Sequence, residues 1–378
     1  MIWGGSLLAA AAMCYTVAAA LAAALAARAR ARPAPHMLPD HWPPVTVLKP
    51  LCGAEHELYE CLRSFCDQAY PSYQIVFGVS DGDDPAVAVV NRLRSEFPAS
   101  DLKIAIDRRQ HGSSRKVSNL INMMALARHD YLVISDSDVR VTPDYLAKIV
   151  RPLLDSGVGI VTCPYQGNPR AGFWSLLGSL FINEWFMPSV NVAALCGSRS
   201  FAFGATIGIR RSVLAGVGGF ASIANQLADD YRLGELTRRL GLSTVLSEVV
   251  VETCVDERSC GDLVRHELRW LRTIRAVRPI GYSLSFITFG LPVAGFGWLL
   301  AGAWPAAAFF GITALARIVL HCTVRRPNSA LAHLFVLPLR DGLSLGLWAW
   351  GFVTRRVHWR EDRYHVTRDG SAQPVVRI

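Results

Sequence analysis

Two aspartates, Asp136 and Asp138, stand one residue apart at the end of the apolar run 131–134. Such a run is typical of a buried strand in a parallel sheet, and side chains at i and i+2 of a strand share one face. Both carboxylates are therefore expected at the carboxyl end of the strand, where open α/β sheets bind ligands. Carboxylate oxygens there suit a hard cation, Mg²⁺ or Mn²⁺, although the spacing alone leaves two solvated loop acids as the alternative.

Two further acids are candidates for chemistry. Asp81 follows the apolar segment "YQIVFGVS". Asp230 lies in "NQLADDYRLGELTRRLG", near the expected start of a helix, where a negative charge is stabilised. A carboxylate placed there can accept a proton from a reacting hydroxyl. Asp229 is the competing candidate, and both acids can instead serve only the helix dipole.

A basic helix is expected over "GDLVRHELRWLRTIRAVR", with His266, Arg269 and Trp270 among its residues. Its arginines recur at spacings of three and four, which forms a cationic face able to clamp a diphosphate. The alternatives are a membrane-surface helix, a core tryptophan and a structural histidine. In "RKVSNLINM", Lys116 and Asn119 can touch a phosphate or a ribose, or can be a solvated lysine and a capping asparagine.

Strand and helix signals alternate over residues 45–280 and must position these side chains. Strands are expected at "VTVLKP", "YQIVFGVS", "LKIAI" and "YLVIS", and helices at "EHELYECLRSFC", "DPAVAVVNRLRSEF" and "RKVSNLINMMALAR". Thr142 as N-cap and Pro143 at the first helical position predict the start of the next helix. The alternation predicts an α/β fold with a Rossmann-like, mostly parallel sheet and right-handed crossovers.

Membrane segments explain why 51% of the 378 residues are hydrophobic. Residues 1–27 carry no charged side chain and precede Arg28, Arg30 and Arg32. A cleaved signal peptide would carry its charge first, so the segment predicts an N-terminal transmembrane anchor. A Pro/Arg-rich linker is expected over 28–44, and the charge bias places the 45–280 domain in the cytoplasm.

The region 281–353 is predicted to return to the membrane. Two spans are expected, at about 281–301 and 305–323, with Arg325 and Arg326 on the cytoplasmic side. The segment 329–353 is less regular, because each of its halves is too short to span a bilayer.

The middle of segment 329–353 holds Pro338, Arg340 and Asp341. An ionised pair at bilayer depth is costly, so we expect a re-entrant or interfacial helical pair, with Arg340 directed toward the 45–280 domain. A fourth span, in which Arg340 and Asp341 pair with each other, is the alternative. The re-entrant form returns the basic tail 354–378 to the cytoplasm, with its arginines at positions 355, 356, 360, 363 and 368.

Charge and cysteine usage narrow the function classes. The formal charge is +9, but basic residues concentrate beside apolar segments and in one helix, which favours anionic lipid and a phosphorylated substrate over nucleic acid. The nine cysteines form no C-x-x-C pair, which argues against disulfides and a structural zinc site. The aromatic stretch 171–197, interrupted by Glu184 and Pro188, fits either an interfacial helix or ordinary core.

Eight short pieces together resemble one enzyme family. They are "VTVLKPLCGAE", "VSDGDDPA", "RKVSNLINM", "DSDVRVTPDYL", "GGF" at 218–220, "LADDYRLGE", "RHELRW" and "WREDRY". In this order they resemble the membrane glycosyltransferases of the ceramide glucosyltransferase type (families 2 and 21), and most closely the bacterial glycosyltransferases associated with hopanoid biosynthesis. Any one piece alone is weak.

The resemblance implies a GT-A fold, an inverting mechanism, a UDP-sugar donor and a membrane-lipid acceptor, hopanoid or ceramide, with glucose or N-acetylglucosamine as the sugar. It implies that the protein lies in a bacterial inner membrane. The roles it implies are a donor contact for Asp81, metal binding for Asp136 and Asp138, and the general base for Asp230. His266, Arg269 and Trp270 match the Q/R-x-x-R-W motif, with a histidine in place of its first residue.

Two other functions compete with this one. A processive polysaccharide synthase shares the fold and the R-W helix but needs several membrane spans after that helix to form a channel, whereas about three short segments follow here. A non-catalytic membrane scaffold would not need the acids and Arg269 that this chain retains. Transfer from a UDP-sugar by the purified protein separates these alternatives.

Overall fold

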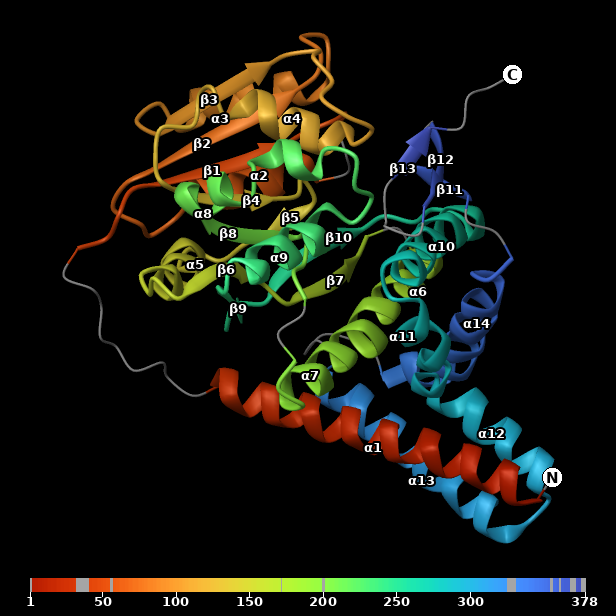
Figure 1. The fold of residues 1–378 in the computed structure, drawn as a ribbon. Coiled ribbons are helices and arrows are strands. Elements are labelled where there is room, and N and C mark those ends of the chain that lie inside the picture. The colour runs from red at the N-terminus through yellow and green to blue at the C-terminus, as the bar shows by residue number, and fades with distance from the viewer. Residues whose placement is uncertain are drawn as a thin grey trace. The chain divides into compact units, whose positions relative to one another are not determined.

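The computed structural model describes residues 2–31, 41–54, 57–170, 172–198, 201–324, 331–353, 356–359, 362–367 and 372–374. The chain divides into two compact units, whose elements are labelled in Figure 1. The helical unit comprises Met1–His36, Pro169–Ser198 and Glu257–Asp369, and the sheet unit comprises Met37–Asn168, Arg199–Asp256 and Gly370–Ile378. The expected cytoplasmic arginines 325, 326, 355, 360 and 368, and residues 32–40 of the linker, lie outside the described residues.

A seven-stranded sheet forms the centre of the sheet unit, in the order β3-β2-β1-β4-β8-β6-β9. Its pairs are parallel except where β8 meets β4 and β6, so the prediction of a mostly parallel sheet is confirmed. The strands are β1 (Val45–Pro50), β2 (Tyr73–Val79), β3 (Asp101–Ile106), β4 (Tyr131–Ser135), β6 (Val158–Thr162), β8 (Thr206–Arg210) and β9 (Ser243–Leu246).

Helices cover both faces of this sheet. Alternate strand residues point to opposite faces, so Val47 and Phe77 pack with α2, α3 and α5, while Leu48 and Val76 pack with α4, α8 and α9. The helices are α2 (Leu58–Cys66), α3 (Ala86–Glu96), α4 (Arg115–Met123), α5 (Tyr145–Leu153), α8 (Arg211–Gly216), the 3₁₀ helix η2 (Phe220–Ile223) and α9 (Asp229–Arg239).

The chain leaves the main sheet directly after Ser135, and this corrects one expectation. Asp136 and Asp138 lie in a turn and not on the strand itself, because β5 (Val139–Arg140) turns away to pair with β10 (Val251–Val255) in a small sheet completed by β7 (Tyr165–Pro169). The next helix also begins later than expected. Its N-cap is Asp144, and the Thr142 hydroxyl bonds the Asp144 carboxylate, so α5 starts at Tyr145.

Among the residues that the structure describes, two helices of the helical unit are long and apolar enough to cross a membrane. They are α1 (Ile2–Ala31), apolar over Ile2–Arg30, and α13 (Trp304–Val324), which confirms two of the predicted spans by length and composition. Together with α12 (Gly290–Ala301) they pack against one another. The protein is therefore a membrane protein.

The segment predicted to span the membrane over 281–301 is broken in the structure, and its two parts are apolar enough to cross only when they are taken together. The chain bends by 74° between α11 and η3 (Pro279–Leu284 and Ser285–Thr288) on one side and α12 on the other. Pro292 explains the break, because its ring clashes with a carbonyl one turn earlier and it has no N–H to donate there. With 12 residues, α12 alone is about 18 Å long, too short for a bilayer core.

The aromatic stretch 171–197 forms helix α6 (Phe173–Phe181), a π-helical turn η1 (Ile182–Phe186) and α7 (Met187–Leu195). These elements follow one another without a break, and Pro188, which has no N–H to donate, comes directly after the π-helical turn, where the regular α-helical hydrogen bonds are already interrupted. The stretch packs within the helical unit, against α1, α10 (Cys260–Val277) and α14 (Leu337–Trp350).

The expected division of segment 329–353 at Pro338–Asp341 is also wrong. Helix α14 runs unbroken through Arg340 and Asp341, since Pro338 occupies its first turn and the irregular part is the preceding 3₁₀ helix η4 (Leu331–Val336). Arg340 does contact the 45–280 range, through Glu267, as expected. Asp341 bonds Arg317 instead of Arg340, so the alternative pairing is not formed.

The C-terminal part contains a short antiparallel hairpin. Its strands are β11 (Arg356–Trp359) and β12 (Asp362–Val366), and β13 (Ala372–Pro374) follows.

Candidate active site

Lys116 lies at the centre of a cluster of carboxylates in the sheet unit. Its Nζ is 2.5 Å from Asp136 Oδ1 and 3.7 Å from Asp229 Oδ2. The lysine stands in the first turn of α4, whose N-cap is Ser114, so the helix start fixes its position. Burial lowers the pKa of Lys116, but the charges of Asp136 and Asp229 outweigh burial and raise it above its ordinary range. Lys116 is thus a fixed cation and not a solvated lysine.

Asp230 completes the cluster at the start of α9, as expected. Its Oδ2 accepts the Gly204 N–H at 2.7 Å, and its Oδ1 accepts its neighbour's N–H at the same distance. Burial and the adjacent charge of Asp229 raise the pKa of Asp230 to about 6, although Lys116 opposes the shift. A carboxylate with a pKa near neutrality, fixed by two backbone donors, is suited to accept a proton.

Gly204 is a site residue that the sequence did not reveal. A Cβ atom there would lie 3.2 Å from Asp230 Oδ2 and 3.4 Å from Lys116 Nζ. Glycine therefore lets the backbone approach both charged groups. The surrounding letters, "FAFGAT", carry no charge and no known motif, so no local signal separates this glycine from an ordinary one.

A second residue that the sequence analysis missed is Lys49, fully buried in β1. Its ammonium group donates to the backbone carbonyl of Asp136 and lies 3.9 Å from the centre of the Phe65 ring. Asp138, in the same turn, accepts the Thr253 hydroxyl at 2.6 Å. The turn is thus fixed from β1 and β10 together. The available signal was a lone lysine at the end of an apolar strand.

The structure limits how many protein side chains can bind the predicted metal ion. Among the described residues, no three His, Cys, Asp or Glu side chains converge on one point. Asp136 and Asp138 bring two carboxylates from one turn, and Mg²⁺ commonly takes one or two carboxylates and completes its shell with phosphate oxygens and water. The chemistry of this pair fits such a cation, with the remaining ligands supplied by a bound diphosphate.

The other two candidates in the sheet unit have different surroundings. Asp81 is exposed and pairs with Arg108 at 2.6 Å, and this hydrogen bond lowers the pKa of Asp81. Asn119 is buried and donates to the carbonyl of Gly78 at 2.7 Å, which holds the end of β2 in place. Ser114, not Asn119, caps helix α4.

The R-W motif residues lie on α10 in the helical unit. His266 Nδ1 is 2.6 Å from the buried carboxylate of Glu257, and the imidazole stands edge-on to Trp270, with ring centres 5.0 Å apart. Trp270 also lies beside Phe181 and Phe186. The motif is therefore oriented by an aromatic cluster and by a carboxylate behind the histidine.

Solved structures place this architecture in a known class. A mannosyltransferase from Pyrobaculum calidifontis, in complex with GDP-mannose and Mn²⁺, matches with a TM-score of 0.52 and 19% identity, over 92% of this chain and 95% of that one. This likeness shows the fold. The chain is a GT-A protein with membrane helices in its N- and C-terminal regions.

The particular family follows from the sequence. The family described as Glycosyl transferase family 21 matches residues 6–372, and the chain belongs to it. Ceramide glucosyltransferase 1 of Caenorhabditis elegans is 25% identical over 211 residues, which cover 54% of this chain and 44% of that protein. Ceramide glucosyltransferase 3 of the same organism is 24% identical over 241 residues, 63% of this chain and 52% of the relative. The chain thus spans about half the length of these relatives.

Proposed function

We propose that this protein transfers a hexose or N-acetylhexosamine from a UDP-sugar to the hydroxyl of a membrane lipid. The main support is the cluster of Lys116, Asp136, Asp229 and Asp230, in which one fixed cation and one near-neutral base lie side by side. The family and the names of the relatives support transfer of a sugar to a lipid acceptor, and the apolar helices support action at a membrane.

Asp230 serves as the general base. The acceptor oxygen attacks the anomeric carbon as the bond from that carbon to the diphosphate oxygen breaks, and the hydroxyl proton passes to the Asp230 carboxylate. Attack from the face opposite the leaving group inverts the anomeric configuration. The Gly204 and Tyr231 N–H groups hold the carboxylate in place during this step.

Lys116 stabilises the charge of the diphosphate leaving group from α4. Asp136 and Asp138 would hold Mg²⁺ or Mn²⁺, which supplies further positive charge to the diphosphate when bound. Thr253 and Lys49 keep the turn that carries both acids in place. Because Asp136 already bonds Lys116, a metal ion held by Asp136 would share this carboxylate with the lysine.

Asp81 contacts the nucleoside of the donor, and Asn119 supports the strand end beside it. Arg269 acts on the donor diphosphate, while His266 and Trp270 act on the acceptor side. These roles rest on the motif match and on the fixed orientation of His266 by Glu257.

The protein is proposed to lie in a bacterial inner membrane with the sheet unit in the cytoplasm, where UDP-sugars are made. Arg28 and Arg30 in the last turn of α1 support this orientation. A Ser371→Cys variant, in a background lacking reactive native thiols, tests it in intact cells. Labelling of that cysteine by a membrane-impermeant reagent from outside would contradict a cytoplasmic tail.

Purified protein in lipid nanodiscs tests the reaction directly. UDP-glucose and UDP-N-acetylglucosamine are each supplied with ceramide or with a polyhydroxylated hopanoid, and glycolipid formation is followed by mass spectrometry. Transfer in any one combination identifies the sugar and the acceptor. Polymer formation would favour the processive synthase instead, and the absence of transfer and of donor hydrolysis would favour the scaffold.

A further inference from the structure

Arg340 of α14 and Glu267 of α10 form an ion pair inside the helical unit. Nη2 of Arg340 is 2.5 Å from Oε2 of Glu267, and the two side chains are only 2% and 4% exposed. Glu267 follows His266 directly and stands two residues before Arg269. The pair therefore ties the helix that carries the R-W motif to a C-terminal helix.

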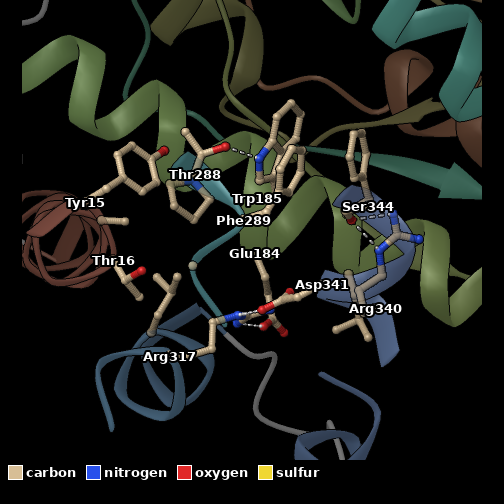
Figure 2. A pocket seen from close by; sticks show the side chains of 16 residues that line it. Tyr15, Thr16, Glu184, Trp185, Thr288, Phe289, Arg317, Arg340, Asp341 and Ser344 are labelled. Carbon is tan, nitrogen blue, oxygen red and sulfur yellow. Dashed lines mark hydrogen bonds and ion pairs between the residues drawn. The ribbon is translucent and has the colours of Figure 1, made fainter. Parts of the chain in front are cut away.

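Contacts other than the ion pair with Glu267 also fix the guanidinium group of Arg340. Ser344, one turn further along α14, accepts from Nε at 3.2 Å and from Nη2 at 2.9 Å (Figure 2). The Phe181 ring lies 5.1 Å from the guanidinium carbon. A side chain held in this way can set the position of its partner without much loss of entropy.

The ion pair is poorly suited to provide stability alone. It contains one direct hydrogen bond, and Arg340 Nη1 and Glu267 Oε1 are buried without a hydrogen-bond partner among the described residues. Burial raises the pKa of Glu267 even though Arg340 opposes the shift. Well-packed apolar residues often replace such a pair at no cost in stability. Its effect is therefore expected in the placement of α10.

A second contact fixes the direction of the two helices. Arg275, further along α10, donates to the carbonyl of Gly351 at the end of α14, at 2.6 Å. Along α10, Glu267 comes before Arg275, and their partners along α14, Arg340 and Gly351, come in the same order. The two helices therefore run side by side in the same direction. Since each residue of an α-helix is rotated by about 100° from the last, fixing Glu267 also fixes the direction of Arg269 and Trp270.

We propose that Arg340 is a positioning residue for sugar transfer, which sets the rotation of α10 and thus the direction of its R-W side chains. This role rests on the proposed function. In this role, helix α14 contributes to catalysis indirectly, through the contact with Glu267. Arg340 itself does not contact the substrate.

The first test is the double variant Arg340→Met/Glu267→Met in full-length protein in nanodiscs. It removes both charges together, so we expect its thermal unfolding midpoint to stay near that of the wild type, while kcat falls at least tenfold and the donor KM rises by a smaller factor, because only Arg269 of the R-W residues acts on the donor. The control is Arg63→Met/Glu96→Met, which removes an exposed ion pair of the sheet unit and should leave kcat unchanged. A folded double variant with wild-type kcat would overturn the proposal.

A second variant covers the case in which the double variant does not fold. Arg340→Lys keeps the buried positive charge but cannot bond Ser344 and Glu267 with one planar group. We expect a normal unfolding midpoint and a kcat between those of the wild type and the double variant. A kcat equal to that of the wild type in a folded Arg340→Lys protein would contradict the positioning role.

A distance measurement separates this proposal from the proposed function. Spin labels on cysteines introduced at the exposed positions 265 of α10 and 339 of α14, in a background without exposed native cysteines, report the distribution of distances between the helices. Arg340→Lys and the double variant should broaden or shift this distribution. If the wild type transfers no sugar, the proposed function fails, but the distance distribution still tests whether Arg340 positions α10. A distribution that is unchanged in both variants would reject the positioning role.

Discussion

Two clusters of ion-paired side chains, one in each unit, differ in their ratio of acidic to basic groups and in their exposure. In the sheet unit, Lys116 faces three acids and the cluster keeps some exposure, 35% for the Asp136 side chain. In the helical unit, Arg317 bonds Glu184 and Asp341, and His321 bonds Glu184 as well (Figure 2 shows the Arg317 contacts). The first cluster has an excess of carboxylates at an accessible place, which suits ligand binding. The second is closed and holds helices together.

Local backbone structure explains how the second cluster forms. Glu184 lies in the π-helical turn η1, which changes the direction of side chains relative to a regular helix. Its oxygens then reach α13 twice, at 2.5 Å to Arg317 and 2.6 Å to His321. The small cavity beside them offers about 20 Å³, enough for about one water molecule.

The largest effect is expected from the accessible cluster. Asp230→Asn removes the proton acceptor but keeps a similar shape, so transfer should fall by about 10²–10⁴-fold while donor binding persists. Steady-state transfer and UDP binding by calorimetry measure the two quantities. Asp229→Asn is the matched control, with the same charge removed one residue away. If Asp229→Asn alone abolishes transfer and keeps binding, the neighbour is the base.

A substitution in the closed cluster of the helical unit should lower the stability of the protein and leave the chemical step unchanged. Arg317→Met leaves Glu184 and Asp341 buried without their shared cation, and breaking a buried ion pair on one side costs about 3–5 kcal/mol. Thermal unfolding in nanodiscs should show a clearly lowered midpoint. Replacing all three groups by apolar residues of similar size should recover much of the loss. An Arg317→Met protein as stable as the wild type would show that the cluster does not hold the helices.

Sequence patterns predicted the sheet unit better than the helical unit, for a physical reason. A buried parallel strand leaves a local trace, so "YLVIS" located β4 and the helix-start signal located Asp230. Gly204 and Lys49 were missed because their importance comes from neighbours distant in sequence.

The helical unit was harder to predict because its helix ends depend on partners. The pattern of charges in 329–353 drew attention to Arg340 and Asp341, yet it could not name Glu267 and Arg317 as their partners. With those partners α14 continues where the sequence alone favoured a break. The bend before α12 is different, since Pro292 was a local signal that the length of the apolar run concealed.

The pH dependence of transfer is expected to report the accessible cluster. Asp230 must be ionised to accept a proton, and its pKa is raised to about 6. Below that pH, kcat/KM should therefore fall about tenfold per pH unit, and above it the rate should level off. Rates measured between pH 4.5 and 8 with a solubilised acceptor test this. A profile flat down to pH 4.5 would mean that Asp230 has an ordinary pKa or is not the base.

The smallest effect is expected at Asp81, an acid that belongs to neither cluster. Its carboxylate is exposed and held by Arg108 in water, where an ion pair contributes little to stability. Asp81→Asn keeps the shape and one acceptor oxygen, so the unfolding midpoint should stay unchanged and the donor KM should rise about two- to tenfold, the range of one ordinary hydrogen bond. The kcat should be unaffected, because the nucleoside does not change charge during transfer. A fall in kcat as large as that of Asp230→Asn would place Asp81 in the reacting centre, and an unchanged donor KM would remove it from the donor site.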